Sequence, residues 1–394
     1  AKISEAIITP GKDNRTNALS QIRAEIIESL GSDYAERKNE IKDIFHDLER
    51  QVMREIILIQ NRRIDGRRFD EIRPISCETA MLPRVHGSGL FTRGETQSLT
   101  TVTLGTKLDE KIIDEVLNQG SEKFTLHYNF PPFSTGEAKP ARGVSRREIG
   151  HGNLAHRALK NMMPTDDENP YAIRVVSDIL ESNGSSSMAT VCAGTLALMD
   201  AGIKLRKPVS GIAMGLVKGS GDEFVVLSDI QGIEDFYGDM DFKVTGTTKG
   251  ITAMQLDMKV GGLKDEIISE TLGRALRARL RVLDVMNACI AAPRSATSRY
   301  APRIQTTHIP VEKIGALIGP GGKTIRGIIE ETGVSIDVED DGTVVVASVS
   351  AEGADRAMAR IEQITAVAEI GRVYTGRVVR TTDFGAFVEF MPGQ

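Results

Sequence analysis

The sequence predicts a mixed α+β (or α/β) multidomain protein, in which an all-helical segment precedes a large core and two smaller modules. Three observations support this prediction. The length of 394 residues exceeds that of a typical single domain. Apolar residues recur at helical spacing in the first part of the chain. From about residue 65 onward, short β-rich runs alternate with helical stretches.

The composition excludes several classes of protein. No apolar run approaches the ~18–20 residues that cross a bilayer, so we expect no membrane partner. The three cysteines, Cys77, Cys192 and Cys289, lie too far apart for a disulfide framework or a CxxC zinc site, which favours a reducing, cytoplasmic location. The net charge of −5 taken alone argues against nucleic-acid binding, but an average hides local patches.

Residues 1–60 are expected to form a helical hairpin. One apolar stripe runs from Leu19 to Leu30 and ends at Gly31, and a second runs from Ile41 to Ile56. The basic run NRRIDGRR at residues 61–68 then marks a boundary.

Residues 61–295 are expected to form one mixed β-α domain. Its predicted strands are β-rich runs bounded by turns, at residues 98–104, 171–180, 209–217, 224–230, 241–247 and 251–260. Its predicted helices lie at about 151–163, 187–201 and 263–291, and the last stops before Pro293.

Residues 303–367 are expected to form a small β-α-α-β-β-α module. Its two central helices are joined by a glycine-rich loop of Gly319, Pro320, Gly321, Gly322 and Lys323. A GxxG loop lets the backbone approach a sugar–phosphate chain without Cβ clashes, and the following helix N-terminus favours anions. Loop and element order together resemble the KH domain, so these five residues are candidate RNA contacts.

Residues 371–394 read as two strands of a third module. Too few residues follow to close a barrel, and the chain starts without a methionine. We interpret the sequence as a piece of a longer polypeptide.

Three consecutive hydroxyls, Ser185, Ser186 and Ser187, stand at the predicted start of a helix and follow a glycine. Such a loop offers N–H and O–H donors to a tetrahedral anion. The alternative is a flexible N-capping loop. No Walker lysine follows, so this is not a P-loop.

An acidic segment follows at residues 232–243, with Glu234, Asp235, Asp239 and Asp241 beside an apolar strand. Hard carboxylate oxygens suit Mg²⁺ or Mn²⁺. Alternation along a strand places Asp239, Asp241 and Lys243 on the same face. The alternative is a solvated acidic loop.

A basic segment spans residues 139–160, where six basic residues stand against one acidic residue. Such local charge suggests a polyanion track, although an ordinary surface patch is the alternative. Aromatic residues at 128–133 offer faces for stacking on bases, or form a rigid packed loop. Arg93 stands at a predicted turn into a strand. The basic residues are Lys139, Arg142, Arg146, Arg147, Arg157 and Lys160.

In their order along the chain, these motifs resemble the polynucleotide phosphorylase family. The segments that carry the resemblance are LPRVHGSGLFTRGETQ, HYNFPPFSTGE, SRREIGHG, ESNGSSSM, GDMDFKV and IGPGGKTI. The resemblance implies a helical linker domain (1–60), a second RNase PH-like catalytic core (61–295), a KH domain (303–367) and the start of a truncated OB-fold RNA-binding domain (371–394). The family's first RNase PH-like core is absent from this sequence, which puts the activity of this chain alone in doubt.

The same resemblance implies an enzyme, a polyribonucleotide nucleotidyltransferase that works as a processive 3′→5′ exoribonuclease in mRNA degradation. Inorganic phosphate is then the co-substrate, nucleoside 5′-diphosphates are released, and the reaction runs in reverse as polymerisation. The expected partners are single-stranded RNA 3′ ends, two further copies in a homotrimer, and components of an RNA-degradation complex.

By motif match, the family's site falls on particular residues of this sequence. Ser185, Ser186 and Ser187 would hold phosphate. Asp235, Asp241 and Lys243 would form the catalytic set, with both aspartates binding Mg²⁺ (or Mn²⁺). Arg93, Arg146 and Arg147 would contact RNA. Two other functions stay open, a hydrolytic 3′-exoribonuclease and a non-catalytic RNA-binding ring scaffold.

Overall fold

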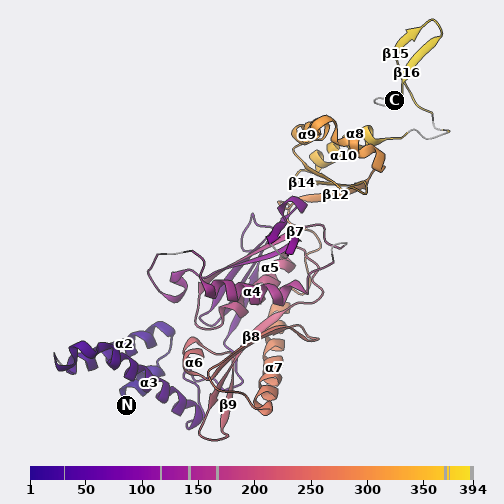
Figure 1. The fold of residues 1–394 in the computed structure, drawn as a ribbon. Helices are drawn as coiled ribbons and strands as arrows, with labels where there is room; N and C mark the ends of the chain where they lie inside the picture. The colour runs from indigo at the N-terminus through magenta and orange to yellow at the C-terminus, as the bar shows by residue number, and fades with distance from the viewer. Residues whose placement is uncertain are drawn as a thin grey trace. The chain divides into compact units, whose positions relative to one another are not determined.

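The computed structural model describes residues 1–30, 32–115, 118–140, 143–165, 168–367, 371 and 373–390. These residues form two compact units (Figure 1). The first comprises Ala1–Thr103, Phe124–Asn169 and Arg174–Ser298. The second comprises Leu104–Lys123, Pro170–Ile173 and the chain from Arg299 onward. The predicted mixed α+β class is confirmed.

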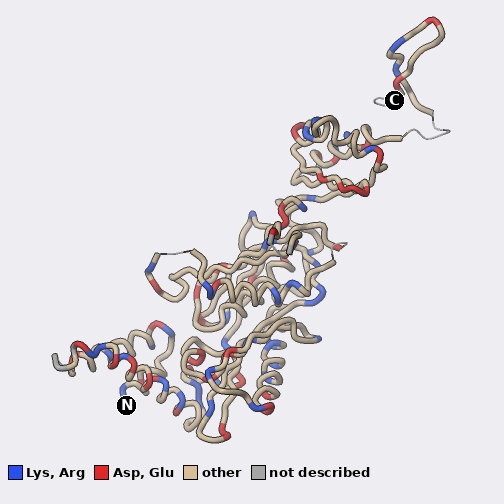
Figure 2. Tube along the Cα trace, in the orientation of Figure 1, with Lys and Arg blue, Asp and Glu red and all other residues tan. Residues whose placement is uncertain are grey.

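The first unit opens with three α-helices rather than a simple hairpin: α1 (Lys2–Ile7), α2 (Lys12–Ser29) and α3 (Lys38–Leu58). The longer two match the predicted stripes and lie side by side, with acidic and basic side chains intermixed along both (Figures 1 and 2). Gly31 lies outside the described residues. The helix α1 was not predicted, yet its Ile7 packs with Met53 of α3 in a core that also contains Ala213 and Leu227.

Two sheets follow, and the strand pairs β1–β2 and β2–β3 of the first sheet are antiparallel. The first sheet has the order β1-β2-β3-β7-β6. Helix α5 (Ser186–Asp200) packs on it and is buried from Ser186 to Met199. In β2, a Cβ on Gly87 would lie only 2.4 Å from the Ala197 carbonyl oxygen, so glycine permits this close packing. The strands are β1 (Ile75–Thr79), β2 (Gly87–Arg93), β3 (Gln97–Gly105), β6 (Phe124–Asn129) and β7 (Ala172–Glu181).

The second sheet has the order β11-β10-β8-β9 and packs on α7 (Asp265–Cys289) through an apolar core. Two further helices of this unit are α4 (Arg146–Lys160) and the short α6 (Gly232–Tyr237). All predicted helices and strands of this region are present. The strands are β8 (Ser210–Lys218), β9 (Phe224–Ser228), β10 (Met240–Gly246) and β11 (Ile251–Met258).

In the second unit, residues 303–365 have the predicted β-α-α-β-β-α order and a sheet ordered β12-β14-β13. An apolar core that includes Leu317, Ile328 and Val346 holds its helices to its sheet. Its elements are β12 (Arg303–His308), α8 (Ile314–Ile318), α9 (Lys323–Thr332), β13 (Ser335–Val338), β14 (Thr343–Ser348) and α10 (Ala351–Thr365).

Two antiparallel hairpins complete the second unit. The pair β4 (Lys111–Glu115) and β5 (Asn118–Glu122) was not predicted. The pair β15 (Arg377–Thr382) and β16 (Gly385–Glu389) corresponds to the two strands expected after residue 371. Residues 391–394 lie outside the described chain, and the described part contains no closed barrel. Within the described ranges, no helix is long and apolar enough to cross a membrane.

Candidate active site

A cleft of about 590 Å³ in the first unit brings together motifs that are far apart in the sequence. The serine loop after β7 lies on it, as do the end of α6 and strand β10. The start of α4 and strand β11 add further walls. The lining side chains that carry chemistry are Lys12, Arg147, His151, Ser185, Asp235, Asp241, Lys243, Asp257 and Lys259.

The serine loop has the geometry of an anion site with two unpartnered hydroxyls, of which only that of Ser185 lines the cleft. Ser185 is the N-cap of α5 and adopts the left-handed conformation, with φ 53° and ψ 53°. The Ser186 hydroxyl is paired with the Tyr128 hydroxyl at 2.7 Å. The Ser185 and Ser187 hydroxyls are buried, and neither has a hydrogen-bond partner among the residues that the structure describes. Because buried polar groups are almost always paired, these two oxygens fit a bound ligand.

The acidic segment divides into two structural and two cleft-facing carboxylates. Glu234 is buried against Arg63, whose Nε donates to its Oε1 at 2.8 Å. Asp239, which was predicted to share a face with Asp241 and Lys243, precedes β10 and does not line the cleft. It accepts instead from Arg54 at 2.9 Å and from the Lys218 amide at 2.7 Å. Only Asp235 and Asp241, the two aspartates predicted as ligands, face the cleft from this segment.

Asp241 and Lys243 form an ion pair on the cleft side of β10, on one face as predicted. The Asp241 Oδ1 is buried without a partner in the described chain. Burial raises the pKa of Asp241, the Lys243 ammonium opposes that shift, and the Asp235 carboxylate adds to it. A bound cation would stabilise the negative charge of the buried Asp241 carboxylate.

Asp257 is a carboxylate of the cleft that the sequence reasoning missed. The antiparallel register of β10 and β11 places it opposite Asp241. Asp235, Asp241 and Asp257 supply the hard oxygen donors that Mg²⁺ or Mn²⁺ prefers. Among the described residues, however, no three such side chains converge closely enough to form a ready-made metal cluster. The donor chemistry therefore fits a divalent cation, but the arrangement of the side chains is not a closed cage.

The basic wall of the cleft comes from the start of α4. Ser145 and Glu148 cap this helix reciprocally, and Glu148 also accepts from the Phe130 amide at 3.0 Å. The Arg147 guanidinium lies 4.6 Å from the centroid of the Phe130 ring and reaches the cleft. Arg146, beside it, is exposed and is not among the cleft-lining residues. Arg142 lies outside the described residues.

His151 lies one helical turn further along α4 and is kept neutral. Burial lowers its pKa to about 3, and the charges of Arg147 and Lys243 act in the same direction. Its Nδ1 lies 3.2 Å from the Tyr128 hydroxyl.

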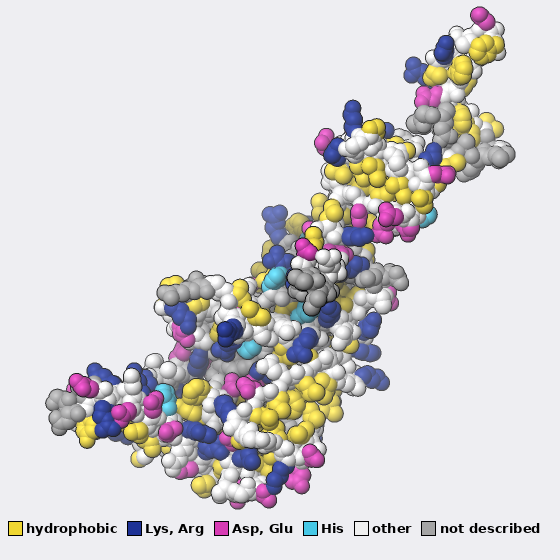
Figure 3. All heavy atoms as spheres, in the orientation of Figure 1, with side chains coloured by type: hydrophobic (Ala, Val, Ile, Leu, Met, Phe, Trp, Pro, Cys, Tyr) yellow, Lys and Arg dark blue, Asp and Glu magenta, His cyan; other side chains and the backbone are white. Residues whose placement is uncertain are grey.

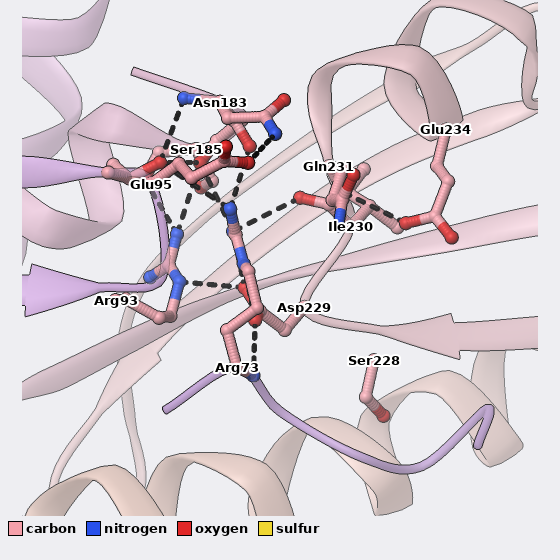
Figure 4. Close-up of polar contacts among 12 residues, drawn as sticks. Arg73, Arg93, Glu95, Asn183, Ser185, Ser228, Asp229, Ile230, Gln231 and Glu234 are labelled. Atoms are coloured by element: carbon pink, nitrogen blue, oxygen red, sulfur yellow. Dashed lines mark hydrogen bonds and ion pairs between the residues drawn. The ribbon is translucent and has the colours of Figure 1, made fainter. Parts of the chain in front are cut away.

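Arg93 ends β2 at the turn into β3, as the sequence predicted, but it is not among the residues that line the cleft. Its side chain is fully buried beneath the serine loop, where Nη2 donates to the carbonyls of Gly184 at 3.2 Å and Ser185 at 3.1 Å. It also forms an ion pair with Asp229 at 2.7 Å (Figure 4). In this chain Arg93 supports the loop from below.

Lys12, at the start of α2, is the second cleft residue that the sequence reasoning missed. Its Nζ donates to the Ser182 carbonyl at 2.9 Å and to the Thr135 carbonyl at 3.3 Å. Its amide donates to Glu95 at 2.8 Å. No local pattern marks Lys12, because its role depends on where the helical segment packs.

The glycine-rich loop of the second unit is an exposed turn between α8 and α9. Gly319, Gly321 and Gly322 have φ of 72°, 58° and 79°, which L side chains rarely adopt. A Cβ on Gly319 would lie 2.0 Å from the Thr324 Oγ1. Pro320 and Lys323 are exposed. Apolar side chains also reach the surface of this module among charged ones (Figure 3).

Comparison with known families agrees with these features. Residues 71–204 match the 3′ exoribonuclease family, domain 1. Residues 1–68 match the RNA binding domain of polyribonucleotide nucleotidyltransferase, and residues 304–363 match the KH domain. The fold and these matches show a domain of the 3′ exoribonuclease family that is joined to a KH domain and to an RNA binding domain of the polyribonucleotide nucleotidyltransferase type.

Along nearly its whole length the chain is similar to polyribonucleotide nucleotidyltransferases, and the resemblance seen in its motifs is confirmed. It is 57% identical to the polyribonucleotide nucleotidyltransferase of Bacteroides fragilis over 399 residues, covering 99% of this chain and 56% of that protein. The enzyme of Heliobacterium modesticaldum is 51% identical over 393 residues, covering 100% and 55%. The chain therefore spans little more than half the length of these relatives.

Among solved structures, rice (Oryza sativa) Rrp46 matches with a TM-score of 0.47 and 20% identity, over 57% of this chain and 98% of that one.

Proposed function

We propose that this chain carries the phosphorolytic site of a processive 3′→5′ exoribonuclease that acts in mRNA degradation in the cytoplasm. The reaction releases nucleoside 5′-diphosphates and runs in reverse as polymerisation. The observation that carries the proposal is the cleft itself. It sets the unpartnered Ser185 hydroxyl at a helix N-terminus beside the buried Asp241–Lys243 pair, and the unpartnered Ser187 hydroxyl is buried in the same helical turn.

Inorganic phosphate is held at the serine loop. The hydroxyls of Ser185 and Ser187 donate to its oxygens, and the free N–H groups at the start of α5 add donors and a favourable dipole. The Ser186 hydroxyl is engaged by Tyr128 and serves to fix the loop. None of the three serines acts as a nucleophile, because the attacking oxygen belongs to phosphate.

In the proposed reaction a phosphate oxygen attacks the phosphorus of the last linkage and the bond to the preceding 3′ oxygen breaks. The proton carried by the attacking phosphate ends on that 3′ oxygen, so RNA shortened by one nucleotide and a nucleoside diphosphate result. Negative charge builds up in the transition state, and the Lys243 ammonium stabilises it. Asp235 and Asp241 would hold the divalent cation, Mg²⁺ or Mn²⁺, whose chemistry is to polarise the scissile phosphoryl group.

RNA is positioned by basic residues and by the KH module. Arg147 reaches the cleft and Arg146 lies next to it at the helix start, where both offer cations to the RNA 3′ end. The loop of Gly319, Pro320, Gly321, Gly322 and Lys323 takes the backbone of single-stranded RNA upstream. The family's assembly as a homotrimer and its place in an RNA-degradation complex belong to the same proposal.

Analysis of the products from poly(A), with and without inorganic phosphate, tests this function. We expect RNA loss only when phosphate is present, with ADP as the product. AMP formed without phosphate would instead indicate a hydrolytic exoribonuclease. Bound but undegraded RNA under both conditions would indicate the RNA-binding scaffold.

A further inference from the structure

A buried charge cluster lies directly beneath the serine loop and is not explained by the reaction itself. Its centre is Asp229, which follows β9, is fully buried and has a positive φ of 55°. Arg73 donates to this carboxylate through Nε and Nη2, each at 2.8 Å, and through its amide at 2.9 Å. Arg93 pairs with the same carboxylate at 2.7 Å (Figure 4).

Both arginines extend from Asp229 to the backbone of the serine loop. Arg73 Nη1 donates to the Asn183 carbonyl at 2.7 Å. Arg93 Nη2 donates to the carbonyls of Gly184 and Ser185. Three consecutive carbonyls thus point down into one charged cluster. Thr96 reinforces them, because its hydroxyl donates to Gly184 at 3.1 Å and accepts from the Asn183 amide at 3.0 Å.

The orientation of these carbonyls sets the orientation of the N–H groups that follow them. In a trans peptide the C=O and the next N–H point in opposite directions. The amides of Gly184, Ser185 and Ser186 therefore turn away from the arginines, toward the cleft side of the loop. None of these three amides has a hydrogen-bond acceptor within the described part of the chain. Successive free N–H groups around a left-handed residue form a concave anion site.

The charge of the cluster points to the same ligand. Three arginines pair with Asp229: Arg73, Arg93 and Arg67. Arg67 also pairs with Asp65, so among these five side chains three are basic and two are acidic. An excess of basic groups under the loop and amides that face outward suit a compact dianion.

We propose that Asp229, Arg73 and Arg93 are positioning residues for phosphate. They orient the carbonyls of the serine loop toward the arginines and thereby its amides toward the cleft. None of the three touches the phosphate. The inference rests on the proposed function, since it assigns the source of affinity for the co-substrate. In the reverse reaction the β-phosphate of the nucleoside diphosphate takes the same place, so both ligands depend on the cluster.

The test uses Arg93→Lys, which keeps the charge beside Asp229 but cannot donate to Asp229 and the loop carbonyls in the same fork geometry. Binding of inorganic phosphate is measured by titration calorimetry, and KM values are measured for phosphate, nucleoside diphosphate and RNA. We expect the phosphate Kd and both phosphate-linked KM values to rise roughly tenfold or more, as loss of charge-assisted hydrogen bonds implies. The RNA dissociation constant should stay unchanged.

The matched control is Arg279→Lys. Arg279 is another buried arginine of the same unit that donates to a backbone carbonyl, that of Thr247, away from the loop. Its substitution should change phosphate affinity less than about twofold. Thr96→Val is the second variant, and it leaves every charge in place. If Arg93→Lys fails to fold, Thr96→Val tests whether support of the loop backbone controls phosphate affinity. It should weaken phosphate binding in the same selective way.

The possible outcomes separate this inference from the function on which it rests. If the unaltered protein binds no phosphate, the proposed function itself fails. If the unaltered protein binds phosphate and the folded Arg93→Lys variant binds it equally well, only the positioning role is wrong. A loss of RNA affinity as large as the loss of phosphate affinity would likewise contradict a selective role.

Discussion

The four carboxylates between residues 234 and 241 differ in their surroundings, and those surroundings decide their roles. Glu234 and Asp239 neutralise Arg63 and Arg54 inside the fold. Asp235 and Asp241 are left facing the cleft. Sequence alternation predicted that Asp241 and Lys243 share a face, but no local pattern identifies which acidic residues an arginine elsewhere in the chain will pair with. The roles of these four carboxylates could not be predicted from sequence, because they depend on arginines that only the tertiary fold brings near.

At the residue scale, Asp241→Asn tests the catalytic carboxylate. The amide keeps the shape of the side chain but removes the charge that pairs with Lys243 and would bind a cation. We expect kcat for phosphorolysis to fall roughly 100-fold or more, because positioned charge is the main source of rate in phosphoryl transfer. RNA affinity should be retained. Steady-state kinetics and a filter-binding assay measure the two quantities.

The matched control for that variant is Asp222→Asn. Asp222 is an exposed aspartate that pairs with Lys264, away from the cleft. Its turnover should equal that of the unaltered protein. Unchanged turnover in Asp241→Asn would remove Asp241 from the catalytic set.

Asp229→Asn tests the buried cluster through stability. Burial alone would raise the pKa of Asp229, but the Arg73 and Arg93 guanidiniums outweigh that effect and hold the pKa well below its ordinary value. Removing one partner of a buried charge pair costs about 3–5 kcal/mol. We expect a loss of this size in the free energy of unfolding at pH 7, measured by urea denaturation.

The effect of Asp229→Asn on stability should depend on pH. A carboxyl with a lowered pKa in the folded state stabilises the fold above its unfolded pKa of about 3.9, and the stabilisation is lost as the pH falls below that value. The difference in the free energy of unfolding between Asp229→Asn and the unaltered protein should therefore become smaller as the pH falls below about 4. A difference that stays constant from pH 7 to pH 3 would contradict a charged Asp229.

At the scale of elements, the sequence predicted which segments are helices and strands more fully than how they pair. Helical periodicity predicted α2, α3 and α7, and β-rich runs predicted β7 to β11. The short helix α1 and the β4–β5 hairpin were missed, because six and five residues carry too little periodicity. The position of Asp257 opposite Asp241 depends on strand register, which is a tertiary property.

The GxxG loop is the element whose function is tested most simply. Gly322→Asp places a carboxylate on the loop where we expect an RNA phosphate, so affinity for single-stranded RNA should fall about tenfold or more. Fluorescence anisotropy with a labelled oligonucleotide measures it. Gly327→Asp is the control, because Gly327 lies on α9 with open space around it, outside the loop. Equal affinities of the two variants would show that the loop does not hold RNA.

At the scale of the whole chain, the helical segment contributes directly to the cleft. Lys12 of α2 lines it and donates to the Ser182 carbonyl, just before the serine loop. Arg15, one turn later, donates to Gln231 at 3.1 Å, just before α6. The sequence predicted the helices but not this contact, since it arises only when residues more than 100 positions apart pack together.

Lys12→Met tests this coupling by keeping the apolar stem and removing the ammonium. We expect KM for phosphate to rise about threefold to thirtyfold, because the loop loses hydrogen bonds from a charged donor. Lys2→Met is the control, since Lys2 pairs with Glu25 on the exposed side of the helical segment. The coupling is wrong if both variants keep the KM of the unaltered protein.

The central claim is that phosphate, and not water, attacks the RNA. The most direct measurement supplies ¹⁸O-labelled inorganic phosphate with poly(A) and analyses the released nucleotide by mass spectrometry. The account predicts ADP whose β-phosphate carries the label from inorganic phosphate. Unlabelled AMP as the released nucleotide, or label entering the product only from ¹⁸O-water, would contradict it.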